Sequence, residues 1–325
     1  MEKRLSASGT AGVKKTERER LSVWERIKKE LIKNKYIYIL ALPVILYYLI
    51  FCYGPMFGIV IAFKQYELGK GIMESNWVGF KYFIEFFSSM NFARTLRNTL
   101  LISLYDLILG FPAPIIFALL LNEIKSSKFK RTVQTITYLP HFISLVVICG
   151  MITDFFSSNG IVTKVLSMFG APQINYLGDP KFFRSVYVGT NIWQSFGWGS
   201  IIYLAALSGI PAELYEAAQV DGAGRFRQFW AVTLPGISTT IIIMLILRMG
   251  QLLSVGFEKI ILLYNPSTYE TADVIASYVY RRGLGESAQY SYTTAVGLFQ
   301  SVVNLILLVS ANWLSKRYSS VSLFG

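Results

Sequence analysis

Six long apolar stretches dominate the pattern of hydrophobic and polar positions along this chain of 325 residues. They cover about residues 36–63, 96–121, 135–156, 185–208, 237–255 and 293–314. Each is near or above the ~20 residues that a helix needs to cross a bilayer. Pro and Gly interrupt them, but membrane helices tolerate both where neighbouring groups satisfy the backbone. The pattern therefore predicts an all-α polytopic membrane protein with six transmembrane helices.

Lys and Arg predict how these helices are oriented. If the N-terminus is cytosolic, segments 1–35, 122–134, 209–236 and 315–325 hold 19 basic residues in 87 positions, whereas segments 64–95, 157–184 and 256–292 hold 10 in 97. Basic residues concentrate on the cytoplasmic side of membrane proteins. We therefore expect both termini in the cytosol. The net charge of +12 fits this bias and contact with membrane lipid. No basic stripe interleaved with aromatics points to nucleic acid.

The chain divides into three predicted regions. Residues 1–35 form a cytosolic N-terminal tail, residues 36–314 the membrane domain, and residues 315–325 a cytosolic C-terminal tail. Within the first region Ser22 and Glu25 are spaced as a capping box. Trp24 and Leu31 then share a face with lysines around them, which predicts a helix lying on the inner leaflet or contacting a partner subunit.

Catalytic and metal chemistry is not visible in the sequence. No GxxxxGK[ST] phosphate loop occurs, so we expect no ATP or other cofactor on this chain. The single histidine, His141, has no companions for a triad or a metal site. Cys52 and Cys149 lie in apolar stretches and form no CxxC pair. We expect no catalytic residues and no metal.

The run EAAQVDGAGRFRQFWAVTLP, residues 216–235, lies between the fourth and fifth apolar stretches. A short helix beginning at Pro211 is predicted to end where Gly222 and Gly224 allow a left-handed or strained backbone. A second amphipathic segment, Phe226 to Val232, follows, and Pro235 is expected to stop it and to start the next membrane helix. The pattern predicts a helix–turn–helix on the membrane surface, shaped to dock into a cytosolic partner.

This run resembles the EAA loop of ABC-importer permeases, in which EAA is followed by a DGA turn and a closing LP. The resemblance implies that the loop, residues 209–236, couples the permease to an ATPase subunit, which binds ATP and Mg²⁺. Polar contacts would come from Glu216 and Asp221, and the turn from Gly222. The remaining matching or packing positions are Ala217, Ala218, Ala223, Phe226, Phe229, Leu234 and Pro235.

The resemblance covers roughly residues 36–325. WVGFKYF from Trp77 and TLRNTL from Thr95 look like the maltose-type carbohydrate class, and TYLPHFIS from Thr137 and the terminal SLFG look like its oligosaccharide subgroup. The implied fold is that of a type I ABC-importer permease in a bacterial cytoplasmic membrane. The implied partners are a second, homologous permease, two ATPase subunits, an extracytoplasmic solute-binding protein and an oligosaccharide substrate.

Polar residues inside the apolar stretches are costly and are candidates for a substrate path. Asn191, Gln194 and Trp198 share one helical face, with Trp193 beside them. Aromatic rings and amides are the groups that bind sugars. The alternative is a polar contact between helices with a packed Trp.

Four further polar residues extend the candidate path: Arg248, Gln251, Gln300 and Asn304. Arg248 lies near mid-bilayer and requires an anion. Asp106 in the second stretch is the internal candidate, and the carboxylate of an acidic sugar is the alternative. Two other functions remain open. A secondary transporter or channel explains the spans but not the EAA run, and a membrane scaffold explains the run but not the intramembrane polar residues.

Overall fold

The structure, a computed structural model, describes residues 23–285, 288–319 and 321–323. The chain divides into two units, residues 1–60 and 61–325. The predicted tail up to Ser22, and the last two residues of the SLFG motif, lie outside the described residues.

The first unit is helical throughout its described part. Its elements are α2 (Val23–Lys33), α3 (Lys35–Tyr47), the π-turn η1 (Tyr48–Tyr53) and α4 (Gly54–Met56), after which the 3₁₀ helix η2 (Phe57–Phe63) continues into the second unit. Residues 35–63 are long and apolar enough to cross a membrane, in agreement with the first predicted span. A helix is also present where one was predicted before that span. Its position on the inner leaflet stays a prediction.

The second unit begins with the short strands β1 (Lys64–Gln65) and β2 (Asn76–Trp77), which pair antiparallel. The helices up to the middle of the chain are α5 (Gly71–Glu74), α6 (Lys81–Ser88), α7 (Met90–Tyr105), η3 (Asp106–Gly110), α8 (Pro112–Glu123), α9 (Ser127–Phe142), α10 (Leu145–Phe155) and α11 (Ile161–Met168). The remaining helices are α12 (Pro180–Ser208), α13 (Ala212–Val220), α14 (Arg225–Gln228), η4 (Phe229–Thr233), α15 (Leu234–Met249), α16 (Phe257–Leu263), η5 (Pro266–Thr268), α17 (Tyr269–Ala272), α18 (Ile275–Leu284) and α19 (Tyr290–Ser319).

Four helical stretches in the described chain are long and apolar enough to cross a membrane, and two bent pairs raise the number to six if each pair is one span. The second predicted span falls within residues 90–123, the fourth within α12, and the sixth within α19. The fifth is displaced, because the helix runs over residues 225–249 and the chain is not helical from Gly250 to Gly256. The boundary placed after residue 314 falls inside α19.

The third predicted span, residues 135–156, is wrong as a single helix. Helix α9 already begins at Ser127, and a bend of 101° separates it from α10. The bend arises because Ile143 and Ser144 have extended ψ angles of 138° and 137°. Pro140 lies in the last turn of α9, just before this break. The apolar composition continues through the bend, so it hides the change of direction.

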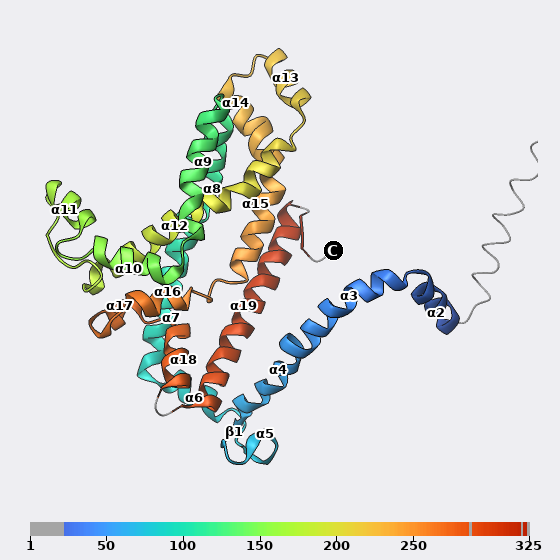
Figure 1. The fold of residues 1–325 in the computed structure, drawn as a ribbon, viewed down its shortest axis with the longest axis vertical. Coiled ribbons are helices and arrows are strands. Elements are labelled where there is room, and N and C mark those ends of the chain that lie inside the picture. Colours follow the sequence, from blue (N-terminus) through green and yellow to red (C-terminus); the bar gives the residue numbers. More distant parts are fainter. Residues whose placement is uncertain (1–22, 286–287, 320, 324–325) are drawn as a thin grey trace, which may run out of the picture. The chain divides into compact units, whose positions relative to one another are not determined.

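Helix α12 is the central packing element of the second unit, against α8, α9 and α15. It crosses α9 closely at Gly197, where an added Cβ atom would collide with the backbone oxygen of Thr137. Small residues allow such close approach between membrane helices. Figure 1 shows α13 at one end of this unit and α6 with α18 toward the other. The predicted surface loop thus lies toward the opposite end of this unit from α6 and α18, which belong to segments predicted to lie outside.

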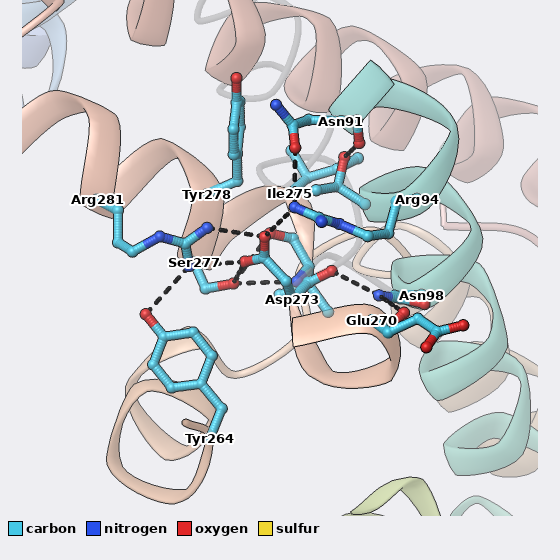
Figure 2. Close-up of polar contacts among 12 residues, drawn as sticks. Asn91, Arg94, Asn98, Tyr264, Glu270, Asp273, Ile275, Ser277, Tyr278 and Arg281 are labelled. Carbon is cyan, nitrogen blue, oxygen red and sulfur yellow. Dashed lines mark hydrogen bonds and ion pairs between the residues drawn. The ribbon is translucent and has the colours of Figure 1, made fainter. Parts of the chain in front are cut away.

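A buried carboxylate fixes α17 and α18 against α7 (Figure 2). Asp273 is fully buried and accepts hydrogen bonds from both terminal nitrogens of Arg281, each at 2.8 Å, and from Ser277 at 2.8 Å. Arg94 of α7 lies 3.3 Å from the same carboxylate, and Asn98 donates to the Asp273 carbonyl at 2.9 Å. Burial acts to lower the pKa of Arg281, but the hydrogen bonds and charge of Asp273 outweigh it and raise the pKa. Arg281 also donates to the hydroxyl of Tyr264, the residue that follows α16, so this cluster connects α18 to the end of α16.

Candidate functional site

The predicted loop is a helix–turn–helix. Its first helix, α13, begins after Pro211 and ends in a Schellman turn at Gly222, whose φ is +74°. The Ala223 N–H donates to the Ala218 carbonyl at 2.8 Å, and the Gly222 N–H donates to the Gln219 carbonyl at 2.9 Å. The prediction of a left-handed backbone at Gly222 is confirmed. The same prediction for Gly224 is wrong.

Gly224 has φ −67° and ψ 169° and caps the second helix of the loop. From Arg225 the chain is helical up to Met249, so the expectation that Pro235 stops a short segment is also wrong. Pro235 occupies the first turn of α15, directly after the π-turn η4. A proline has no N–H to donate, and the π-turn directly before it is the local adjustment by which a continuous membrane helix accommodates this lost hydrogen bond.

Two side-chain contacts stiffen this loop. The Tyr215 and Thr233 hydroxyls lie 3.1 Å apart and connect α13 to η4. Gln228 donates to the Ala223 carbonyl at 2.7 Å across the turn. The loop therefore has a defined shape without a partner.

The outer face of the loop is exposed. Glu216, Ala217, Asp221 and Pro235 are exposed, and so is Phe226 at 77%. Ala218, Ala223, Phe229 and Leu234 are half-buried. Within the described chain, the Glu216 and Asp221 carboxylates have no hydrogen-bond or ion-pair partner. Free acceptors beside an uncovered aromatic ring, on a stiff loop, suit a docking surface.

A polar cavity of about 310 Å³ lies between α7, α12 and the segment after α15. We call it the polar cavity. It is lined by Ile102, Ser103, Asp106, Leu145, Tyr187, Asn191, Gln194, Arg248, Gln251, Leu252, Ser254, Val255, Gly256, Glu258 and Lys259. The structure thus brings together four of the predicted path residues: Asn191, Gln194, Arg248 and Gln251.

The Arg248 guanidinium forms an ion pair with Asp106, as the sequence predicts for an internal partner. Asn191 donates to the same carboxylate at 2.8 Å. Asp106 is buried and begins the π-turn η3. Its negative charge therefore neutralises Arg248, and the alternative role of Arg248 as the group for an acidic sugar loses its basis.

Lys259 was not among the predicted site residues, because residues 256–292 read as an outside loop. Its side chain is only 4% exposed and lines the polar cavity. The ammonium donates to Gln194 at 3.4 Å and lies 5.6 Å from the centre of the Tyr187 ring. Burial lowers the pKa of Lys259 to about 8. The signal in the sequence is a lone lysine directly before the apolar run Ile260 to Leu263.

Gln300 and Asn304 form hydrogen bonds with the non-helical segment after α15 and do not line the polar cavity. Gln300 donates to the Leu253 carbonyl at 2.7 Å. Asn304 accepts from the Leu253 N–H at 3.0 Å and donates to Ser254 at 2.9 Å. Backbone groups that leave a helix inside a membrane need partners, and these amides supply them. Their role in the substrate path stays a prediction; in this structure they bind the non-helical segment after α15.

Trp193 and Trp198 lie outside the polar cavity. Trp193 lines an apolar cavity of about 680 Å³ bounded by α10, α11 and α12. The Trp198 ring stacks on His141 of α9, with ring centres 4.8 Å apart and planes at 4°. Neither ring lines the polar cavity, so Asn191 and Gln194 are the residues of the predicted face that line it.

Comparisons with known proteins agree over nearly the whole chain. The family described as "Binding-protein-dependent transport system inner membrane component" matches residues 110–320. The Bacillus subtilis (strain 168) Protein LplB is 46% identical, covering 90% of this chain and 92% of that protein. The polygalacturonan/rhamnogalacturonan transport system permease protein YteP of the same organism is 43% identical, covering 96% and 95%.

Solved structures give the same result. A chain of a bacterial ABC transporter involved in the import of the acidic polysaccharide alginate is 45% identical, with a TM-score of 0.83, covering 90% of this chain and 99% of that chain. A second structure shows the bacterial alginate ABC transporter in complex with an alginate pentasaccharide-bound periplasmic protein. Its matching chain is 44% identical, with a TM-score of 0.84, covering 92% and 100%.

Proposed function

The chain belongs to the family of inner membrane components of binding-protein-dependent transport systems, and we propose that it forms one half of the membrane path for acidic oligosaccharides. The predicted fold and the resemblance to ABC-importer permeases are confirmed. The chain is thus a permease subunit of a binding-protein-dependent importer of oligosaccharides or polysaccharides. In the proposal a second, homologous permease completes the path, two ATPase subunits bind ATP and Mg²⁺, and an extracytoplasmic binding protein delivers the sugar.

The observation that carries the coupling is the exposed loop of residues 211–235. Its Schellman turn fixes one shape, its two free carboxylates offer acceptors, and Phe226 offers an uncovered ring. Such a surface supports seating in the groove of an ATPase subunit. Closure of the ATPase pair would then move the two loops together. The membrane helices would follow as rigid bodies and reopen the path toward the outside. In this arrangement both chain termini face the cytosol.

An acidic substrate is supported by two kinds of observation. Two similar proteins, 43% and 45% identical, are a permease of a polygalacturonan/rhamnogalacturonan transport system and a chain of a transporter involved in the import of alginate. The polar cavity offers cationic and amide groups from three elements of this chain. The exposed loop distinguishes this proposal from a secondary transporter or channel, for which ATP would have no role.

Co-purification of the ATPase tests the coupling. Phe226→Asp places a charge on the apolar part of the loop and should reduce the ATPase recovered with tagged permease. Phe169→Asp is the matched control, because Phe169 is 86% exposed but follows α11, away from the loop. Equal ATPase recovery from the two variants would refute this docking surface. Uptake of oligogalacturonate by the complete transporter, dependent on ATP and on the binding protein, tests the substrate class.

A further inference from the structure

We propose that Lys259 binds a carboxylate of the transported sugar in the polar cavity and thereby selects acidic over neutral oligosaccharides. This inference rests on the proposed function. It assigns to Lys259 the preference for acidic sugars that the proposed function gives to the whole subunit.

The position of the ammonium carries the proposal. Lys259 extends from α16 into the polar cavity and is 4% exposed. An ammonium has three N–H donors. In the described chain the ammonium makes one long hydrogen bond, to Gln194 at 3.4 Å, and lies over the Tyr187 ring at 5.6 Å, with the buried Cys149 thiol as a further neighbour. Donor capacity therefore remains for a group that enters the cavity.

The other charges of the cavity do not neutralise Lys259. Asp106 and Arg248 form an ion pair with each other. Glu258 lines the same cavity but is exposed, and among the described residues no carboxylate lies within ion-pair distance of Lys259. A buried cation without a counter-ion is unfavourable, and an incoming carboxylate relieves that cost. A neutral sugar would leave the cation unpaired.

The protonation state agrees with this role. Because the pKa of Lys259 is lowered to about 8 by burial, the ammonium is charged at neutral pH, although burial disfavours that charge. An anion at ion-pair distance would favour the charged form and be bound in return. Asn191 and Gln251 lie in the same cavity with amide groups suited to sugar hydroxyls. Charge would thus select the substrate and the amides would hold its uncharged parts.

Uptake of a matched pair of sugars by the complete transporter in proteoliposomes tests the inference. The pair is a galacturonate oligosaccharide and the same oligosaccharide with methyl-esterified carboxyl groups. The affinity of the binding protein for each sugar is measured separately, and uptake is normalised to assembled complex. Lys259→Met should lower kcat/KM for the acidic sugar at least about tenfold relative to its ester, the factor that 1.4 kcal/mol of lost interaction produces. Lys259→Arg should retain the preference.

Two further variants separate the outcomes. Lys164→Met removes an exposed lysine on α11 and should leave the ratio unchanged. Glu258→Gln removes the other carboxylate of the cavity wall and should raise the preference for the acidic sugar, which keeps the test valid if Lys259→Met fails to assemble. An unchanged ratio in Lys259→Met, or a lowered preference in Glu258→Gln, would overturn the inference. If the unmodified transporter imports only the ester, the proposed substrate class itself is wrong.

Discussion

Gly222 is the position at which a single substitution should separate coupling from membrane insertion. Its φ of +74° lies in the left-handed region, which side chains other than Gly rarely adopt. Space is not the obstacle, because a Cβ atom at Gly222 would have no neighbour within 4 Å. Any effect of Gly222→Val therefore comes from the backbone of the turn.

The size of the effect follows from that backbone. A left-handed conformation costs an ordinary L-residue about 1–2 kcal/mol, and Val is less tolerant than Asn. If the loop relaxes to avoid this cost, the Schellman hydrogen bonds of Gly222 and Ala223 are lost and the two helices of the loop change their angle. If the full cost appears in docking, the ATPase would bind roughly five- to thirtyfold more weakly.

The assay is substrate-stimulated ATP hydrolysis and uptake by purified complexes in proteoliposomes. Gly222→Val should lower both while the permease still inserts into the membrane. Gly222→Asn should retain most activity, because Asn tolerates the left-handed region. Gly224→Ala is the matched control, since Gly224 has φ −67° and a Cβ atom there would also have no neighbour within 4 Å. Full activity of Gly222→Val, or equal losses in the Asn and Val variants, would refute the backbone argument.

Three further predictions concern packing and buried charge. Gly197→Ala should destabilise the protein by about 1–3 kcal/mol, because the new methyl group meets the α9 backbone, whereas Gly189→Ala on the same helix should be neutral in thermal unfolding. Arg248→Ala leaves a buried carboxylate unpaired, so adding Asp106→Ala should restore yield and melting temperature, with a coupling of about 0.5–3 kcal/mol; simple addition of the two losses would argue against the pair. Asp273→Asn should cost about 3 kcal/mol, near the low end for a broken buried ion pair because its arginines are partly exposed, and an unchanged melting temperature would contradict this.

The features that the sequence predicted correctly depend on local chemistry. Long apolar runs have few alternatives to membrane helices, and a DGA turn after a helix requires Gly at one position, as the φ of Gly222 shows. The bend between α9 and α10 escaped prediction because two residues, Ile143 and Ser144, change direction inside an apolar run. The continuation of the helix through Pro235 escaped because a π-turn before a proline has no clear sequence pattern.

Which polar residues line the polar cavity was predicted less well, since polarity alone does not say what a side chain faces. Gln300 and Asn304 are as polar as Gln194, yet their partners are the backbone groups that become free where the fifth helix ends. That need exists only once the chain leaves the helix at Met249. Lys259 shows the converse error, because a residue outside every predicted span enters the cavity through folding of the segment after that break.

These two observations belong together. The non-helical stretch from Gly250 to Gly256 is hydrogen-bonded by side-chain amides of α19. It also allows α16 to turn back toward α12, where Lys259 reaches Gln194. In a continuous fifth span up to residue 255, as the hydrophobic pattern suggested, the backbone groups would hydrogen-bond to one another within the helix. Gln300 and Asn304 of α19 would then have no backbone partner there. Broken helices are tolerated at membrane depth where they line a cavity, and here the break supplies that cavity with Gln251, Ser254 and Lys259. The polar residues of the sixth span thus affect the polar cavity indirectly, by stabilising the non-helical stretch that supplies part of its lining.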